Sequence, residues 1–196
     1  KKQAIAKVLE ERKIKELAKP YIHLCVSLPK FSKMDTIVEK SVELGVKTIK
    51  PFVSDYSFVK SLGKISESKK SRWGKIVVSG TQQSGRGDLM KVSQPVTFDE
   101  ILSEFSDETN QKSNALGLFF YEGESSLGVK EALKEASKLG LEQVWVFVGS
   151  EGGFSLKEVD QFKAKGLEPI TLGEQILRVE TACVALASII KYELVL

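Results

Sequence analysis

The chain has 196 residues, of which 42% are hydrophobic and 28% are charged. We therefore expect one sizeable domain with a packed core and room for at most a small appendage. No apolar run approaches the roughly 18–20 residues that span a membrane, and one histidine with two isolated cysteines offers no zinc-binding spacing. We therefore expect neither a membrane-spanning segment nor a bound metal ion. The start, Lys1-Lys2-Gln3, lacks a signal-like apolar run, and Cys25 and Cys183 are expected to be buried free thiols in a reducing cytoplasm.

The net charge of +3 is unevenly distributed along the chain. Residues 1–91 hold 20 Lys and Arg against 9 Asp and Glu, whereas residues 92–196 hold 9 against 17. The first half is therefore +11 and the second −8. A one-sided positive field suits a polyanionic partner, most simply a nucleic acid, although a solvated lysine-rich helix face explains the same charge equally well.

Strand-like and helix-like segments alternate along most of the chain. Residues 1–20 are polar, rich in Lys and Glu, and unable to form a core alone. We then expect strands at 21–28, 48–53, 116–121, 143–148 and 168–172, and helices at 35–44, 67–82, 97–105, 129–139, 155–166 and 180–193. Polar residues 107–114 are expected to form a loop. The alternation predicts an α/β fold with a mostly parallel sheet.

Two glycine-bearing loops follow short apolar strands near the end of the chain. Gly149-Ser150-Glu151-Gly152-Gly153 is neither a phosphate-binding Walker loop nor a full G-x-G-x-x-G fingerprint, and alone it is explained by a simple strand-to-helix turn. Paired with Leu172-Gly173, it predicts a small-molecule pocket at the ends of parallel strands. The segment 174–179 is expected to bury Ile176 and Leu177 and to place Arg178 at the pocket mouth. The alternative for Arg178 is an ion pair with Glu180.

Three separated motifs stand out in the chain. They are the two C-terminal loops, through Ile176-Leu177-Arg178-x-Glu180-Thr181-Ala182; the segment from Lys33 to Pro51 with Glu43-Leu44-Gly45-Val46; and Gln82-Gln83-Ser84-Gly85-Arg86. Together they resemble the RsmE family of 16S ribosomal RNA uracil-N3 methyltransferases. The match runs from about residue 22 to the end. This sequence departs from the family at Ser150, where proline is usual, at Gln82, where glutamate is usual, and at Asp55-Tyr56-Ser57, where Glu-Arg-Ser is usual.

The resemblance implies the SPOUT methyltransferase fold over residues 21–196, with a C-terminal trefoil knot. It also implies a homodimer, S-adenosylmethionine as cofactor, and 16S ribosomal RNA or the small ribosomal subunit as partner. Residues 1–20 would be a remnant of, or a linker to, an N-terminal PUA-like RNA-binding barrel. The final helix is apolar on nearly all sides, as burial against both core and partner requires.

The resemblance also assigns roles to individual residues. Arg178, assisted by Glu180, would stabilise the uracil anion, and Lys33, Lys40, Gln83 and Arg86 would contact RNA. The expected cofactor-binding residues are Phe120, Tyr121, Val148, Gly149, Gly152, Gly153, Leu172, Gly173, Ile176, Leu177, Thr181 and Ala182. Two alternatives are a SPOUT enzyme that methylates tRNA ribose 2′-O atoms and a catalytically silent RNA-binding protein. A Rossmann-type enzyme is disfavoured because its glycine loop follows the first strand.

Overall fold

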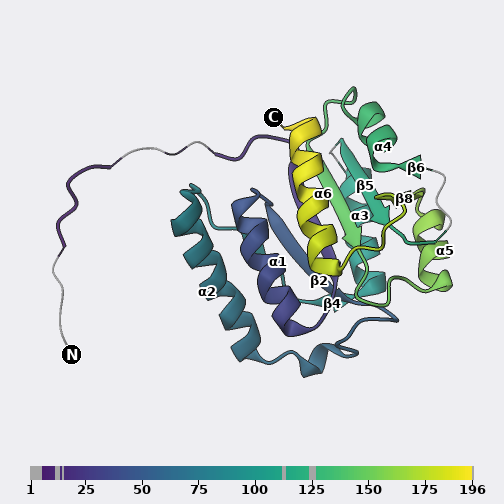
Figure 1. Ribbon diagram of the computed structural model, residues 1–196, viewed down its shortest axis with the longest axis horizontal. Coiled ribbons are helices and arrows are strands. Elements are labelled where there is room, and N and C mark those ends of the chain that lie inside the picture. The colour runs from purple at the N-terminus through teal and green to yellow at the C-terminus, as the bar shows by residue number, and fades with distance from the viewer. Residues whose placement is uncertain (1–5, 12–13, 15, 112–113, 124–126, 196) are drawn as a thin grey trace.

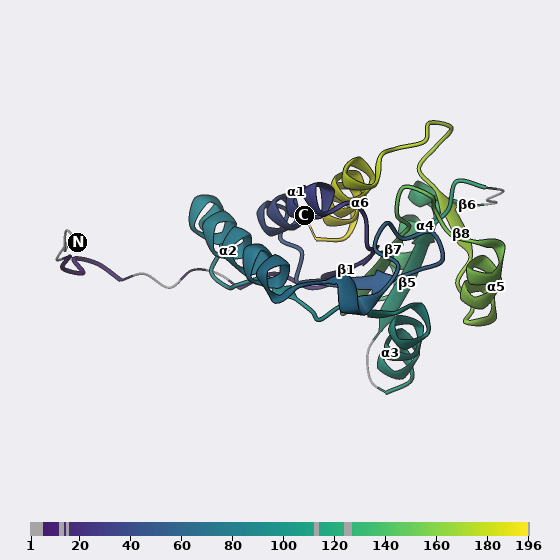
Figure 2. The same cartoon turned by 90° about the horizontal axis from the view of Figure 1, so that it is seen from below.

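The computed structural model describes residues 6–11, 14, 16–111, 114–123 and 127–195. One sheet forms the middle layer, and helices cover both of its faces (Figures 1 and 2). The strands are β1 (Tyr21–Ser27), β2 (Thr48–Val53), β3 (Lys91–Val92), β4 (Val96–Thr97), β5 (Ala115–Phe120), β6 (Leu127–Gly128), β7 (Gln143–Val148) and β8 (Pro169–Thr171). The helices are α1 (Phe31–Glu43), η1 (Leu62–Lys64), α2 (Glu67–Ser84), α3 (Phe98–Gln111), α4 (Val129–Ala136), α5 (Leu156–Ala164) and α6 (Val179–Leu194).

The named strands pair in parallel throughout, in the order β3-β2-β1-β7-β5-β8-β6, with β4 also on β2. The expected mostly parallel α/β sheet is therefore confirmed. Because β7 lies between β1 and β5, the carboxyl ends of β7, β5 and β8 come together at one edge of the layer. Ligands of open α/β sheets bind at such carboxyl ends.

The central strands are buried on both faces, which explains their continuous apolar sequences. Along β1, Leu24 and Val26 face a mainly aliphatic cluster that includes residues of α1, α2, α4 and α6. Cys25, between them, faces an aromatic cluster that α3 and α5 cover. In that second cluster the rings of Phe119 and Phe162 stack with centroids 4.4 Å apart.

The two cysteines are buried free thiols, as expected, and burial raises the pKa of both. His23 belongs to β1, with its ring centroid 5.4 Å from that of Trp145. Burial, reinforced by Lys50 and Lys47, lowers the pKa of His23 to about 4. His23 is therefore neutral near pH 7. Among the described residues, no helix is both long enough and apolar enough to cross a membrane.

The structure differs from the expected elements at the start of α1, at the end of α3 and in three short strands. Helix α1 begins at Phe31, four residues early, because its N-cap Lys30 makes no side-chain capping bond that a sequence could signal. Helix α3 continues to Gln111, so the loop expected from residue 107 is wrong over 107–111; residues 112–113 lie outside the described part. The hydroxyls of Ser106 and Thr109 donate to carbonyls of the preceding turn, so both polar side chains are satisfied within this helix. Strands β3, β4 and β6, of two residues each, were not expected.

The described residues before β1 have no regular secondary structure as far as Pro20, and they lead away from the domain (Figure 1). Lys19 is fastened to the domain by an ion pair with Glu142, at 2.6 Å. The assignment of residues 1–20 to a barrel remnant or linker, and of 21–196 to the catalytic domain, stays a prediction.

Candidate active site

A pocket of about 620 Å³ opens where β5, β7 and β8 end and α6 begins. Its size lies within the range of small-molecule sites. Eleven of the twelve expected cofactor-binding residues line it: Phe120, Tyr121, Val148, Gly149, Gly152, Gly153, Leu172, Gly173, Ile176, Leu177 and Ala182. Thr181, the twelfth, is exposed on the first turn of α6 and does not line the pocket. The two glycine loops and the end of β5, far apart in sequence, therefore form one site.

The first loop, Gly149–Gly153, turns back on itself. Gly153 donates its N–H to Ser150 O at 3.0 Å, and a Cβ added to Gly149 would lie 2.8 Å from Gly153 Cα. Gly153 itself has φ +67°, a conformation that favours glycine. At Gly152, an added Cβ would lie 2.8 Å from Tyr56 Cβ. The glycines are thus required by the tight packing of the loop itself.

Ser150, where the family usually has proline, has a clear structural role. Its side chain is buried, and its Oγ donates a 2.6 Å hydrogen bond to Tyr56 O. This bond ties the first glycine loop to the segment that follows β2. The substitution therefore replaces a rigid ring with a hydrogen-bonded anchor.

The second loop is held by Thr171 and Gly173. Thr171 Oγ1 accepts from Gly173 N at 3.1 Å and donates to Gly173 O at 3.0 Å, and Gly173 has φ +112°. The chain then runs irregularly to α6. The expected burial of Ile176 is wrong, because this side chain is 75% exposed, whereas Leu177 is half-buried. Both still line the pocket, so Ile176 offers an uncovered apolar wall.

Arg178 is the N-cap residue of α6 and lines the pocket with an exposed side chain. Within the described part of the chain, its guanidinium has no hydrogen bond or ion pair, so the alternative pairing with Glu180 is not formed. Glu180 is instead 3.5 Å from Lys33 Nζ, which also lies 3.4 Å from Glu151 Oε1. Lys33, expected to contact RNA, is therefore at the pocket wall between two carboxylates, and Arg178 keeps its donors free.

Glu151 is a site residue that the sequence reasoning missed. It lines the pocket, pairs with Lys33 and accepts a 3.4 Å hydrogen bond from the Lys30 backbone N–H. It thereby links the first glycine loop to the start of α1. The only sequence signal was a carboxylate inside a glycine loop. The described residues contain no cluster of His, Cys, Asp or Glu that could hold a metal.

The remaining RNA-binding candidates lie away from the pocket. Lys40, on α1, pairs with Glu39 and Glu43 at 2.9 Å each, and Gln83 is exposed near the end of α2. Neither arrangement tests RNA contact, so both stay predictions.

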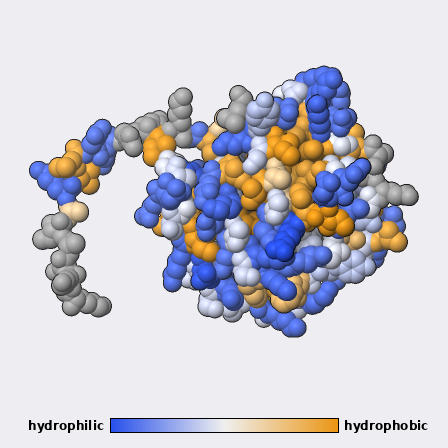
Figure 3. Space-filling model, in the orientation of Figure 1, coloured by the Kyte–Doolittle hydropathy of each residue, from blue (hydrophilic) through white to orange (hydrophobic). Residues whose placement is uncertain are grey.

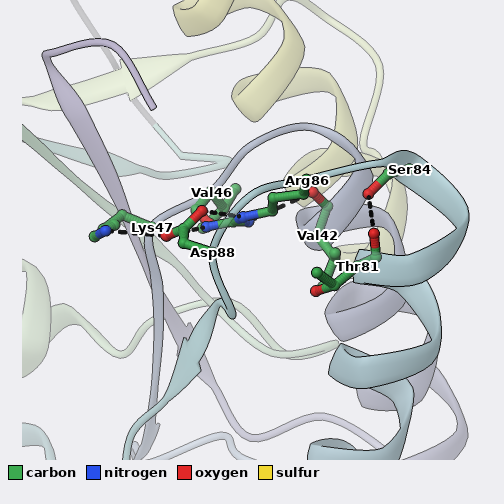
Figure 4. A network of polar contacts seen from close by, with 7 residues as sticks. All are labelled: Val42, Val46, Lys47, Thr81, Ser84, Arg86 and Asp88. Carbon is green, nitrogen blue, oxygen red and sulfur yellow. Dashed lines mark hydrogen bonds and ion pairs between the residues drawn. The ribbon is translucent and has the colours of Figure 1, made fainter. Parts of the chain in front are cut away.

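Arg86, the last of these candidates, has a side chain that is only 5% exposed. Its guanidinium donates to Val46 O at 2.7 Å and Val42 O at 3.4 Å, at the carboxyl end of α1 (Figure 4). It also donates to both oxygens of Asp88, at 2.8 and 3.3 Å. A cation here satisfies the last carbonyls of the helix and complements its dipole. Arg86 therefore holds α1 to the segment after α2, and its contact with RNA stays a prediction.

A profile of the RNA methyltransferase domain family matches residues 15–191. The ribosomal RNA small subunit methyltransferase E of Buchnera aphidicola (subsp. Schizaphis graminum) is 31% identical over 91% of this chain and 68% of its own length. The Aquifex aeolicus protein of the same name is 36% identical over 80% of this chain and 62% of its own. The chain thus spans about two thirds of the length of these relatives.

The fold matches solved structures of the same family. The crystal structure of ribosomal RNA small subunit methyltransferase E from Neisseria gonorrhoeae, bound to S-adenosyl methionine, superposes with a TM-score of 0.71 at 28% identity, covering 88% of this chain and 65% of that one. This likeness confirms the expected SPOUT methyltransferase fold, while the trefoil knot stays a prediction. The profile match, the sequence identities and the shared fold agree that this chain belongs to the RsmE family, the ribosomal RNA small subunit methyltransferases E.

Proposed function

We propose that this protein transfers the methyl group of S-adenosylmethionine to N3 of a uridine in 16S ribosomal RNA of the small subunit. The observation that carries the proposal is the single pocket in which both glycine loops, the end of β5 and Arg178 meet. Membership of the RsmE family supports ribosomal RNA as the substrate and S-adenosylmethionine as the donor. The atom that accepts the methyl group, N3 of the uracil base, is the more specific part of the proposal.

The residues of the pocket fit this cofactor. Leu172, Leu177 and Ala182 offer an apolar surface for a flat adenine. The backbone of both loops offers N–H and C=O groups for hydrogen bonds to the edge of the adenine. The carboxylates of Glu122 and Glu151 also line the pocket and suit the sulfonium and ammonium groups of the molecule. Bound S-adenosylmethionine supplies an already activated sulfonium methyl group. The protein mainly has to hold the acceptor in line with it.

Uridine N3 carries a proton and becomes a good nucleophile only when that proton has passed to solvent water. N3 then takes the methyl group, and S-adenosylhomocysteine leaves. A cation beside O2 or O4 stabilises the imide anion that loss of the proton creates and so lowers the effective pKa at N3. Arg178 is the proposed cation, because its guanidinium lines the pocket and is free of partners among the described residues. Glu180, held by Lys33, would keep the first turn of α6 in place beneath it.

The homodimer and the cytoplasmic location belong to the same proposal. Helix α6 carries Val184, Ala185 and Ile189 only half-buried, and Figure 3 shows apolar residues gathered on the face that carries this helix. A second copy packed there would cover them. Light scattering on the purified protein measures its molar mass in solution. A monomer at micromolar concentration would contradict the homodimer.

Product mapping tests the proposed reaction. The protein is incubated with methyl-labelled S-adenosylmethionine and small ribosomal subunits that lack the modification, and the RNA is digested to nucleosides. We expect label in 3-methyluridine from 16S RNA. Label in a ribose 2′-O-methyl nucleoside would identify the ribose-methylating alternative. Cofactor binding without any transfer to RNA would favour the silent RNA-binding alternative.

A further inference from the structure

Two aromatic side chains stand uncovered beside the pocket. Tyr56 is 51% exposed and Phe58 is 56% exposed, although large aromatic rings are usually buried. Both belong to the segment between β2 and α2, and Tyr56 packs against Gly152 of the first glycine loop. Neither ring contributes to the two core clusters among the described residues. Their exposure therefore has no explanation in the stability of the domain.

The backbone beneath these rings is firmly held. Ser27, Ser54 and Ser57 are buried and joined through their hydroxyls, with Ser27 Oγ 2.5 Å from Ser54 Oγ and 2.9 Å from Ser57 Oγ. Phe58 N–H donates to Leu28 O at 2.9 Å, and Tyr56 O accepts from Ser150 at 2.6 Å. The rings thus stand on a rigid support that is tied to the pocket loop, as a preorganised binding surface requires.

Three lysines lie around the rings, beside the carboxylates of Asp55 and Glu151. Lys30 Nζ lies 5.5 Å from the centre of the Phe58 ring, Lys33 lies at the pocket wall and pairs with Glu151, and Lys60 is bonded to Asp55 O. The segment then runs past η1, which ends at Lys64, into the basic first turns of α2 (Figure 1). Rings interleaved with lysines are the pattern of single-stranded nucleic-acid binding, in which bases stack and phosphates meet the cations.

We propose that Tyr56 and Phe58 form a stacking platform for the RNA bases next to the methylated nucleotide. The inference rests on the proposed function, since it takes RNA as the substrate of the neighbouring pocket. Tyr56 contacts the loop that lines the pocket, so a base stacked on its ring is an immediate neighbour of the nucleotide inside. The platform positions the substrate and takes no part in the chemical step. A protein partner is disfavoured because several lysines surround a small apolar area.

The test compares RNA affinity in the variants Tyr56→Ala, Phe58→Ala and the double variant. Alanine keeps the Cβ atom that packs on Gly152, so the loop is expected to stay folded. Binding is measured by fluorescence anisotropy with a single-stranded uridine-containing oligonucleotide, in the absence of cofactor. We expect each single variant to bind about 10-fold more weakly, because base stacking on an aromatic side chain contributes about 1–3 kcal/mol. Tyr56→Phe, which keeps the ring, should bind within about 2-fold of the original protein.

A matched control is Tyr192→Ala. Tyr192 is 72% exposed near the end of α6, about 20 Å along the helix from its pocket end, so its loss should leave RNA affinity unchanged. A second arm uses oligonucleotides with abasic sites beside the target uridine. They should weaken binding to the original protein and have little further effect on the double variant, because coupled groups are not additive.

The result that overturns the platform is full RNA affinity in the double variant, or an abasic penalty that persists in it undiminished. Calorimetry measures the affinity for S-adenosylmethionine independently of RNA binding, so a failure of the platform can be told apart from a failure of the proposed function. The variants should bind S-adenosylmethionine as the original protein does. If the original protein fails to bind or transfer the methyl group, the proposed function fails, whereas the platform is still judged by the anisotropy.

Discussion

Arg178 and Arg86 both lie in motifs that resemble the RsmE family, but the structure uses them in opposite ways. Arg178 is exposed at a pocket, and its guanidinium is unpaired within the described part of the chain. Arg86 is almost fully buried, and its donors bond to the end of α1 and to Asp88. A guanidinium can serve a ligand only where its donors are free. The comparison teaches that a motif marks an important residue without saying whether it serves the substrate or the fold.

The largest effect is expected from Arg178→Ala. If this cation stabilises the uracil anion, its loss should lower turnover about 100- to 1000-fold, as for the loss of one oxyanion-stabilising donor. Affinity for S-adenosylmethionine should change by less than about 5-fold, because the loops remain. Single-turnover methylation and calorimetry measure the two quantities.

The control for that variant is Lys138→Ala. Lys138 is 61% exposed just after α4 and pairs with Glu135, so the substitution removes one positive charge away from the pocket. Its turnover should stay near that of the original protein. Equal losses in both variants would mean that Arg178 acts only through the overall charge, and original turnover in Arg178→Ala would remove it from the mechanism.

The next effect is expected from Arg86→Ala, and it should appear in stability. The change removes the guanidinium from Asp88, which keeps only Lys47, and from the carbonyls of Val42 and Val46. We therefore expect a loss of about 3 kcal/mol in the free energy of unfolding. Urea unfolding measures it. The folded variant should bind RNA within about 2-fold of the original protein, and a large loss of RNA affinity at unchanged stability would contradict the structural role.

How far the sequence could predict this molecule depends on whether the cause was local. Strand β7 and helix α5 follow from neighbouring residues, and both agree with the expected elements. The pocket followed from pairing two glycine loops with the rule for parallel strands. The burial of Arg86 depends on carbonyls about 40 residues away, and the exposure of Ile176 depends on an irregular segment without periodicity. The ion pair between Lys33 and Glu151 also joins segments that are distant in sequence, so no local pattern could predict it.

The smallest expected effect is a pH dependence that sharpens the structural side of the comparison. Hydrogen bonds from Arg86, supported by Lys47, lower the pKa of Asp88 to about 2 from its ordinary value of 3.8. The ionised carboxylate therefore stabilises the fold above about pH 4, and this contribution is lost as the pH falls towards 2. The full shift corresponds to about 2.5 kcal/mol, and because the side chain is 30% exposed we expect about 1–2 kcal/mol.

Urea unfolding of the original protein and of Asp88→Asn at pH 6 and pH 3 tests this dependence. The difference between their free energies of unfolding should be smaller at pH 3. In an Arg86→Ala background this narrowing should become much smaller, because only Lys47 then remains to lower the pKa of Asp88. A difference that stays constant with pH in the original background would show that Arg86 does not hold the charge of Asp88.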